Sequence, residues 1–249
     1  MEIALAIVSG MAIGSVLGFV GAGGSMLAVP IFIYVFGLSP VAATTASLLV
    51  VFVGAASGAL PRIKQREVLI REALVIWAIG LITNLSSAYY LPRIPENYVL
   101  TGFALVLIIA GVSMLVPTPQ QQSERKVSLF ALVAISLAIG ALTGLFGIGG
   151  GFLAIPILIL FYNVSPVKAA GTSLFIIMIN TLTGFFAHYR HWSDVDWLLP
   201  IIIALVALVI SRIASHRSSK VSPATLKRAF AYFVFAIAFF TLVETWVIS

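Results

Sequence analysis

Long hydrophobic runs alternate with short polar breaks along the whole chain. The apolar runs cover residues 2–20, 25–37, 41–60, 73–91, 98–116, 128–146, 152–162, 166–187, 197–211 and 229–248. Most of them approach the roughly 20 helical residues that a bilayer core of about 30 Å requires. They lack the alternating polar pattern of outer-membrane barrel strands. The pattern therefore predicts an all-α polytopic membrane protein.

The composition supports this class and excludes others. Hydrophobic residues make up 61% of the 249 residues and charged residues only 9%, whereas soluble domains carry about 25% charged residues. This excludes a soluble globular enzyme, a disordered chain and a coiled coil. Because the chain has no cysteine, disulfide scaffolds and thiolate metal sites are excluded as well. The first run lacks the basic start of a secretory signal, so we expect it to be retained.

Two of the runs are too short to cross a bilayer easily. Residues 25–37 and 152–162 would form helices of about 20 and 17 Å. Each run follows a glycine cluster, GAGGS at 21–25 and GIGGG at 147–151. This is the pattern of a discontinuous helix that starts inside the membrane.

An internal repeat relates the two halves of the chain. Residues 18–48 align without a gap on residues 144–174, at a constant shift of 126, and 15 of the 31 positions are identical. The matches include glycines and a Ser-Pro pair, which are more specific than shared apolar residues. We therefore predict an N-terminal repeat over 1–120 and a related C-terminal repeat over 121–249.

The basic residues predict how the halves are oriented. They gather in three loops: Arg62, Lys64, Arg66 and Arg71; Arg125 and Lys126; and Arg212, Arg217, Lys220, Lys227 and Arg228. The positive-inside rule places all three loops in the cytoplasm, which accounts for the net charge of +6 without nucleic acid. Reading 2–37 and 128–162 as single crossings would put the third loop on the other side. We therefore predict inverted-topology repeats with broken helices in the cell (inner) membrane, with both termini outside.

The glycine breaks are the best candidates for a binding site. A helix N-terminus carries unpaired N–H groups and about half a positive charge, and glycine lets a ligand approach the backbone. Inverted symmetry would bring two such ends together near the midplane, where they suit a small anion. The alternative is that these glycines only permit close helix packing. The candidate residues of the breaks are Gly21, Gly23, Gly24, Ser25, Gly147, Gly149, Gly150 and Gly151.

Polar side chains inside the apolar runs are the second candidate set. They are Thr45, Ser47, Thr172, Ser173 and Asn180. Their alternative role is hydrogen bonding within or between helices. The charged and histidine residues of 188–196 are expected in a solvated external loop. We find no catalytic motif and no metal-ligand cluster in the sequence, so we expect no enzyme activity, no cofactor and no metal site.

Three segments carry a resemblance to a known family. Gly144 to Pro156 reads GxxGxGGGxLxxP, Ser165 to Ser173 reads SPxxAxxTS, and His188 to Trp197 reads HYRHWSDVDW; Gly18 to Ser47 echoes the first two. The chain resembles the sulfite exporter TauE/SafE family over nearly its whole length. The resemblance implies an inner-membrane exporter or permease of small sulfur-containing anions such as sulfite and organosulfonates, with its site at the two glycine breaks.

The sequence therefore predicts a secondary transporter of small sulfur-containing or organic anions, working by alternating access around a midplane site. The alternatives are a passive anion channel and a membrane accessory subunit that transports nothing. The expected partners are a small anionic substrate and the lipid bilayer, with no nucleic acid. Homo-oligomer formation is left open, as are the substrate, the direction and the coupling ion.

The predicted glycine site can be tested directly. Gly24→Leu and Gly150→Leu should each abolish anion binding while leaving a folded protein, because the added side chain blocks the approach to the backbone N–H groups. Binding of radiolabelled sulfite to purified protein measures this. Survival of binding in both variants would rule out the glycine site.

Overall fold

The computed structural model describes residues 2–20, 25–115, 129–147, 154, 158, 164–217 and 223–248. Over these residues the chain is helical, and they contain no strand. The elements are α1 (Glu2–Val20), α2 (Ser25–Pro30), η1 (Ile31–Val35), α3 (Pro40–Lys64), α4 (Ile70–Tyr90), η2 (Leu91–Arg93), α5 (Glu96–Leu115), α6 (Leu129–Phe146), α8 (Pro166–Ala187), η3 (Tyr189–Asp194), α9 (Leu198–Arg217), α10 (Pro223–Val243) and η5 (Glu244–Ile248). The predicted runs are thus confirmed as helices, except for 152–162, of which only Ala154 and Leu158 are described.

The repeated Ser-Pro pairs begin equivalent helices. The Ser39 side chain accepts a hydrogen bond from the Ala42 N–H at 3.4 Å, and Pro40 is the first residue of α3. Ser165 accepts from the Lys168 N–H at 3.5 Å in the same way at the start of α8. A serine cap followed by proline at the first helical position is a favourable helix start.

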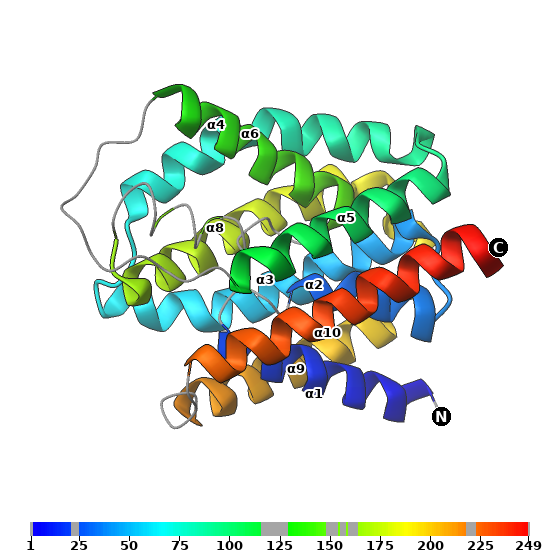
Figure 1. The fold of residues 1–249 in the computed structure, drawn as a ribbon, viewed down its shortest axis with the longest axis horizontal. Helices are drawn as coiled ribbons and strands as arrows, with labels where there is room; N and C mark the ends of the chain where they lie inside the picture. The colour runs from blue at the N-terminus through cyan, green and yellow to red at the C-terminus, as the bar shows by residue number, and fades with distance from the viewer. Residues whose placement is uncertain are drawn as a thin grey trace.

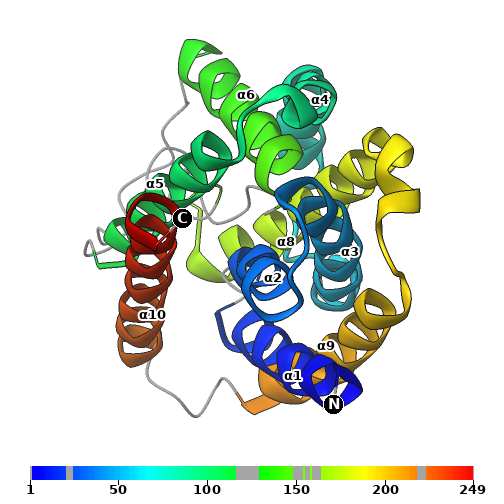
Figure 2. The same ribbon diagram turned by 90° about the vertical axis from the view of Figure 1, so that its right-hand side faces the viewer.

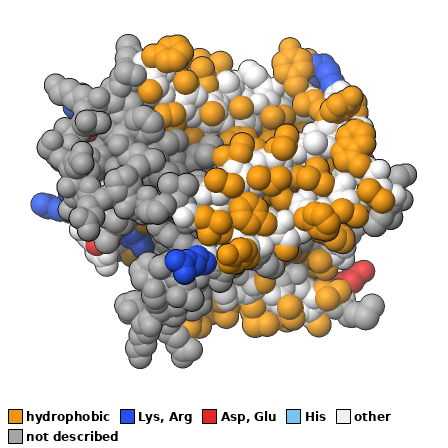
Figure 3. Space-filling model, viewed as in Figure 1, with side chains coloured by type: hydrophobic (Ala, Val, Ile, Leu, Met, Phe, Trp, Pro, Cys, Tyr) orange, Lys and Arg blue, Asp and Glu red, His pale blue; other side chains and the backbone are white. Residues whose placement is uncertain are grey.

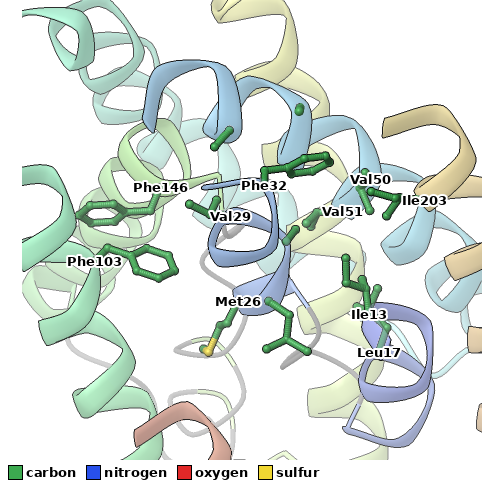
Figure 4. Close-up of a cluster of buried hydrophobic side chains, with 14 of the residues drawn as sticks. Ile13, Leu17, Met26, Val29, Phe32, Val50, Val51, Phe103, Phe146 and Ile203 are labelled. Carbon is green, nitrogen blue, oxygen red and sulfur yellow. The ribbon is translucent and has the colours of Figure 1, made fainter. Parts of the chain in front are cut away.

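The short first-half segment lies in the middle of the bundle. α2 continues into the π-helical turn η1, so residues 25–35 form one short helical unit. Its side chains Met26 to Val29 and Phe32 are almost completely buried. Ile13, Val50 and Ile203 belong to the same apolar cluster (Figure 4). Figure 2 shows α2 near the centre of the helical arrangement.

The remaining helices pack in pairs around this centre (Figures 1 and 2). α1 packs against α9, α4 against α6, α3 against α8, and α5 against α10. α3 also contacts α9, and α4 also contacts α8. Glycines allow the closest approaches: a Cβ at Gly140 in α6 would collide with the Gly80 carbonyl of α4, and one at Gly14 in α1 would lie 2.6 Å from the Ala207 carbonyl oxygen of α9.

The outer surface of the bundle is apolar. α3, the stretch Ile70–Arg93 and the stretch Lys168–Ala187 are long and apolar enough to cross a membrane. Large apolar side chains remain exposed, such as Ile82 at 68% and Phe239 at 71%. Figure 3 shows hydrophobic side chains over much of the described part of one face, with few Lys and Arg side chains. These features fit a multi-pass membrane protein whose outer side chains face lipid.

The glycine contact between α4 and α6 leads to a stability prediction. Gly140→Ala should destabilise the protein by about 1–3 kcal/mol, because its methyl group forces the two backbones apart. Gly58→Ala is the matched control, since its Cβ would meet only the movable end of the Leu174 side chain, at 3.0 Å. The melting temperatures of the two variants are compared in detergent, with size-exclusion chromatography after heating as the measure of how much protein stays folded. Equal melting temperatures would contradict the predicted backbone contact.

Candidate functional site

The glycine breaks are only partly described. Gly21, Gly23, Gly24, Gly149, Gly150 and Gly151 lie outside the described residues, so their predicted role stays a prediction. α2 begins at Ser25, the last residue of the first cluster, and the helix break predicted before it falls on residues 21–24, outside the described residues. Gly147, the first residue of the second cluster, is described.

Gly147 lies directly against α3. Its N–H donates to the Thr143 carbonyl oxygen at 2.9 Å and it has a φ of +63°, so it ends α6 in a conformation that favours glycine. A Cβ at this position would collide with the Ser47 Oγ and lie 2.9 Å from the Thr44 carbonyl oxygen. The structure therefore brings together two predicted site residues, Ser47 and Gly147, that lie one hundred positions apart in the sequence.

Asn180 presents a buried amide without a partner. It lies in α8 with an exposed fraction of 0%, and neither its Oδ1 nor its Nδ2 is hydrogen-bonded in the part of the chain that the structure describes. Its backbone carbonyl accepts a hydrogen bond from Asn84 Nδ2 of α4 at 3.0 Å. An unpaired buried amide is costly, so it offers a donor and an acceptor to a ligand.

The predicted hydroxyl residues lie at different places in the fold. Ser47 donates to the Thr44 carbonyl at 2.8 Å, which is the intrahelical alternative that the sequence left open. The Thr172 hydroxyl accepts from the Leu69 N–H at 2.9 Å and so holds the loop before α4 against the start of α8. Ser173 is fully buried in α8. Thr45 is also fully buried, but on the side of α3 that faces the end of α8.

The position of His188 differs from the one that the sequence predicted. It was expected in a solvated loop, yet its exposed fraction is 0%. Its Nδ1 lies 3.1 Å from Thr45 Oγ1, and its Nε2 lies 3.1 Å from the Gly144 carbonyl oxygen. In the neutral ring, Nε2–H can donate to the Gly144 carbonyl oxygen, and Nδ1 is then an acceptor. The Thr45 hydroxyl donates to the Val41 carbonyl oxygen at 2.8 Å, so its single proton is shared between Val41 and His188 Nδ1. His188 therefore links the end of α8 to α3 and α6.

The rest of that loop matches the expectation of a solvated segment. Arg190, Asp194 and Asp196 are exposed. His191 pairs with Asp194 at 3.0 Å on the surface. The sequence does hold one signal that sets His188 apart from this loop, since the shift of 126 pairs it with Arg62.

A cavity with both polar and apolar lining residues opens among α1, α3, α8 and α9. Its volume is about 640 Å³, and its lining includes Gly18, Ser57, Arg62, Glu67, Ser211 and Arg212. Ser57 and Ser211 are hydrogen-bonded across it, with their oxygens 2.9 Å apart. Gly18 stands three positions before the first glycine break, so the cavity reaches the end of α1 that leads into this break.

The repeat places a very different environment at the equivalent positions. Applying the shift of 126, the cavity residues Gly54, Ser57 and Arg62 correspond to Asn180, Thr183 and His188. There, Asn84 donates to Thr183 Oγ1 at 3.2 Å and His188 is bonded as described above. Arg62 therefore borders a cavity, whereas its counterpart His188 is packed and hydrogen-bonded; Thr183 borders a separate groove at the other end of the bundle.

Metal ligands are not gathered in the described ranges, which contain no cluster of three or more His, Cys, Asp or Glu side chains. The arrangement instead offers neutral donors, a buried amide and two guanidinium groups. Such groups can hold an anion without a metal ion.

The burial of His188 leads to a prediction about pH. Desolvation lowers the pKa of His188 to about 4. The unfolded chain takes up the proton near the ordinary value of about 6.5, so stability should fall as the pH drops from about 6.5 to about 4. Thermal unfolding across this range should show a shallower pH dependence for His188→Gln than for the wild type. His191→Gln, in the exposed loop, is the control and should keep the wild-type slope; identical slopes in all three proteins would refute the prediction.

Comparison with known proteins supports the resemblance seen in the sequence. A family model described as "Sulfite exporter TauE/SafE" matches residues 6–241. A "Probable membrane transporter protein" of Xylella fastidiosa (strain Temecula1) is 28% identical over 250 residues, which cover 96% of this chain and 94% of the relative. The "Probable membrane transporter protein YunE" of Bacillus subtilis is 27% identical, covering 80% of this chain and 82% of the relative.

A third relative aligns over a shorter stretch. The "Probable membrane transporter protein MJ0441" of Methanocaldococcus jannaschii is 33% identical over 115 residues, 44% of this chain and 43% of the relative. No solved structure matches the chain. Because the family model covers nearly the whole chain and long relatives are named as membrane transporters, this protein belongs to the sulfite exporter TauE/SafE family of membrane transporters.

Proposed function

We propose that this protein is a secondary transporter of small sulfur-containing or organic anions, such as sulfite or organosulfonates. Two inverted-topology halves, 1–120 and 121–249, would alternate the access of one central site between the two sides of the membrane. The observation that carries this proposal is the difference between Arg62, which lines an open cavity, and the equivalent residue His188, which is fully buried.

The helix pairs support the relation between the halves. The shift of 126 makes α6 the counterpart of α1, α8 of α3, α9 of α4, and α10 of α5. When each helix is replaced by its counterpart in the other half, the α1–α9 pair becomes the α6–α4 pair, and the α3–α9 pair becomes the α8–α4 pair. All four of these pairs are in contact. The α3–α8 and α5–α10 pairs map onto themselves. This is the set of contacts that a pseudo-two-fold axis between inverted halves would produce.

The difference between equivalent positions supports alternating access. In a symmetric channel, both sides would be equally open. Here the Arg62 side of α3 borders a cavity, whereas His188, the matching residue of the second half, is buried against Thr45 and Gly144. We infer that the protein is in a conformation that is open on the side of Arg62 and Arg212 and closed around His188. The positive-inside rule would place the open side in the cytoplasm.

The polar groups of the cavity favour an anionic substrate. Arg62 and Arg212 both line it, against the single carboxylate of Glu67. Two positive charges at the mouth of a low-dielectric cavity raise the local concentration of small anions. The amide of Asn180, which has no partner among the described residues, lies six residues beyond the cavity residue Leu174 in α8. It would donate to a sulfonate or sulfite oxygen if the substrate moves further in from the cavity.

Cysteine labelling can test the one-sided opening, because the chain contains no native cysteine. Without substrate, a charged maleimide should label Ser57→Cys rapidly and Thr45→Cys slowly, because Ser57 lines the cavity and Thr45 is fully buried against His188. Saturating sulfoacetate should reduce the difference, because substrate allows the halves to exchange conformations. Ser193→Cys, on an exposed loop residue, is the control and should label equally in both conditions. Equal, substrate-independent labelling at 57 and 45 would contradict alternating access and favour the passive channel.

Transport by the purified protein tests the substrate class. Flux of labelled sulfite into proteoliposomes should saturate and should be inhibited by sulfoacetate or taurine; non-saturating flux would favour a channel.

Asn180→Ala should raise the half-saturating concentration of sulfite by about tenfold, since a hydrogen bond to a charged group contributes about 1.5 kcal/mol. Asn97→Ala, near the surface at the start of α5, is the matched control. An unchanged half-saturating concentration in Asn180→Ala would remove this residue from the site.

A further inference from the structure

A second groove lies at the opposite end of the bundle from the arginine-lined cavity. It has a volume of about 720 Å³ and lies between the C-terminal ends of α4 and α8. Its wall is apolar, with Leu81, Leu85 and Phe186, and its rim carries Arg93 and Arg190. The groove therefore combines an apolar wall with two cationic groups at one end.

Neutral aromatic partners hold both arginines in place. Arg93 Nη2 donates to Tyr89 Oη at 2.9 Å, and its guanidinium carbon lies 4.3 Å from the centre of the Tyr89 ring. Arg190 Nε donates to Tyr189 Oη at 3.1 Å, and its guanidinium carbon lies 5.7 Å from the Tyr189 ring centre. A guanidinium has five N–H donors, so these contacts leave donors on each arginine for an anion.

The acidic residues near the rim are engaged elsewhere. Asp194 pairs with His191, and Asp196 accepts from the Leu198 N–H at 3.1 Å. Neither arginine forms an ion pair with a carboxylate of the described residues. Two guanidinium groups that share a groove without a counterion attract an anion such as a phosphate.

The apolar part of the groove continues onto the lipid-facing surface. Leu85 is 47% exposed and Phe186 is 58% exposed, and Ile82 on the adjoining surface of α4 is 68% exposed. Tyr89 and Tyr189, more than half exposed, stand at the helix ends, where tyrosines favour the membrane–water interface. A freely soluble anion would use only the arginines. A phospholipid would use the whole groove, with its phosphate at the rim and an acyl chain along Leu81, Leu85 and Phe186.

We propose that this groove is a binding site for one anionic phospholipid, whose phosphate is held by Arg93 and Arg190. The bound lipid would bridge the ends of α4 and α8 on the side of the molecule where His188 lies. The proposal is independent of the transported substrate, since it uses none of the residues that line the arginine-bearing cavity.

Native mass spectrometry of the detergent-purified protein, titrated with phosphatidylglycerol, tests the site. The double variant Arg93→Gln/Arg190→Gln should bind the lipid more weakly by roughly tenfold or more. The double variant Arg71→Gln/Arg228→Gln removes the same charge from exposed residues outside the groove and should bind as the wild type does. Equal weakening in both double variants would overturn the proposal, because it would show a general effect of charge.

Two further measurements distinguish a phospholipid from a soluble anion or a second protein chain in the groove. Leu85→Trp keeps both arginines but fills the apolar wall, so it should also weaken lipid binding. Inorganic phosphate and glycerol phosphate should compete poorly with phosphatidylglycerol. Strong competition by either, with full lipid binding by Leu85→Trp, would identify a soluble-anion site instead. A dimer that is stable on delipidation and that Leu85→Cys cross-links would place a second copy of the chain in the groove and overturn the lipid proposal.

Discussion

The requirement that every backbone N–H and C=O in a bilayer be satisfied within the protein is the constraint on which this structure depends. It explains why all described segments are helical and why a short helix is tolerated only where protein surrounds it. α2 and η1 are too short to span, and their side chains from Met26 to Val29 are almost fully buried at the centre of the bundle. The longer helices pack around this unit and present their apolar outer surfaces to lipid.

The two parts of the chain that the repeat relates share a sequence pattern but differ at the equivalent residues Arg62 and His188. Arg62 is long and charged, so burying it would be costly, and it lines a water-accessible cavity. His188, at the equivalent position, can be neutral, and its two ring nitrogens contact Thr45 and Gly144. The same backbone arrangement can therefore stay open around one residue and close around the other. In the proposed transport cycle, this difference would set which side opens at rest.

The arginines at the two ends of the bundle also have different surroundings. On the cavity side, Arg62 and Arg212 line a polar space with serine, glutamine and glutamate neighbours. At the opposite end, Arg93 and Arg190 lie against tyrosine side chains beside an exposed apolar wall. In the two sites that we propose, the first setting would attract a soluble anion and the second would hold a phosphate that is attached to an acyl chain.

The sequence by itself determined the helices, the repeat and the family. These features depend on local chemistry, namely apolar runs of membrane length, capping Ser-Pro pairs and glycines at a constant shift. The two inverted halves and the glycine site remain predictions from that pattern. Only the tertiary structure decided that His188 is buried, that Gly147 meets Ser47, and that the Asn180 amide is left without a partner among the described residues. Each depends on contacts between helices far apart in the chain, such as Thr45 with His188, and hydropathy along one segment does not encode such contacts.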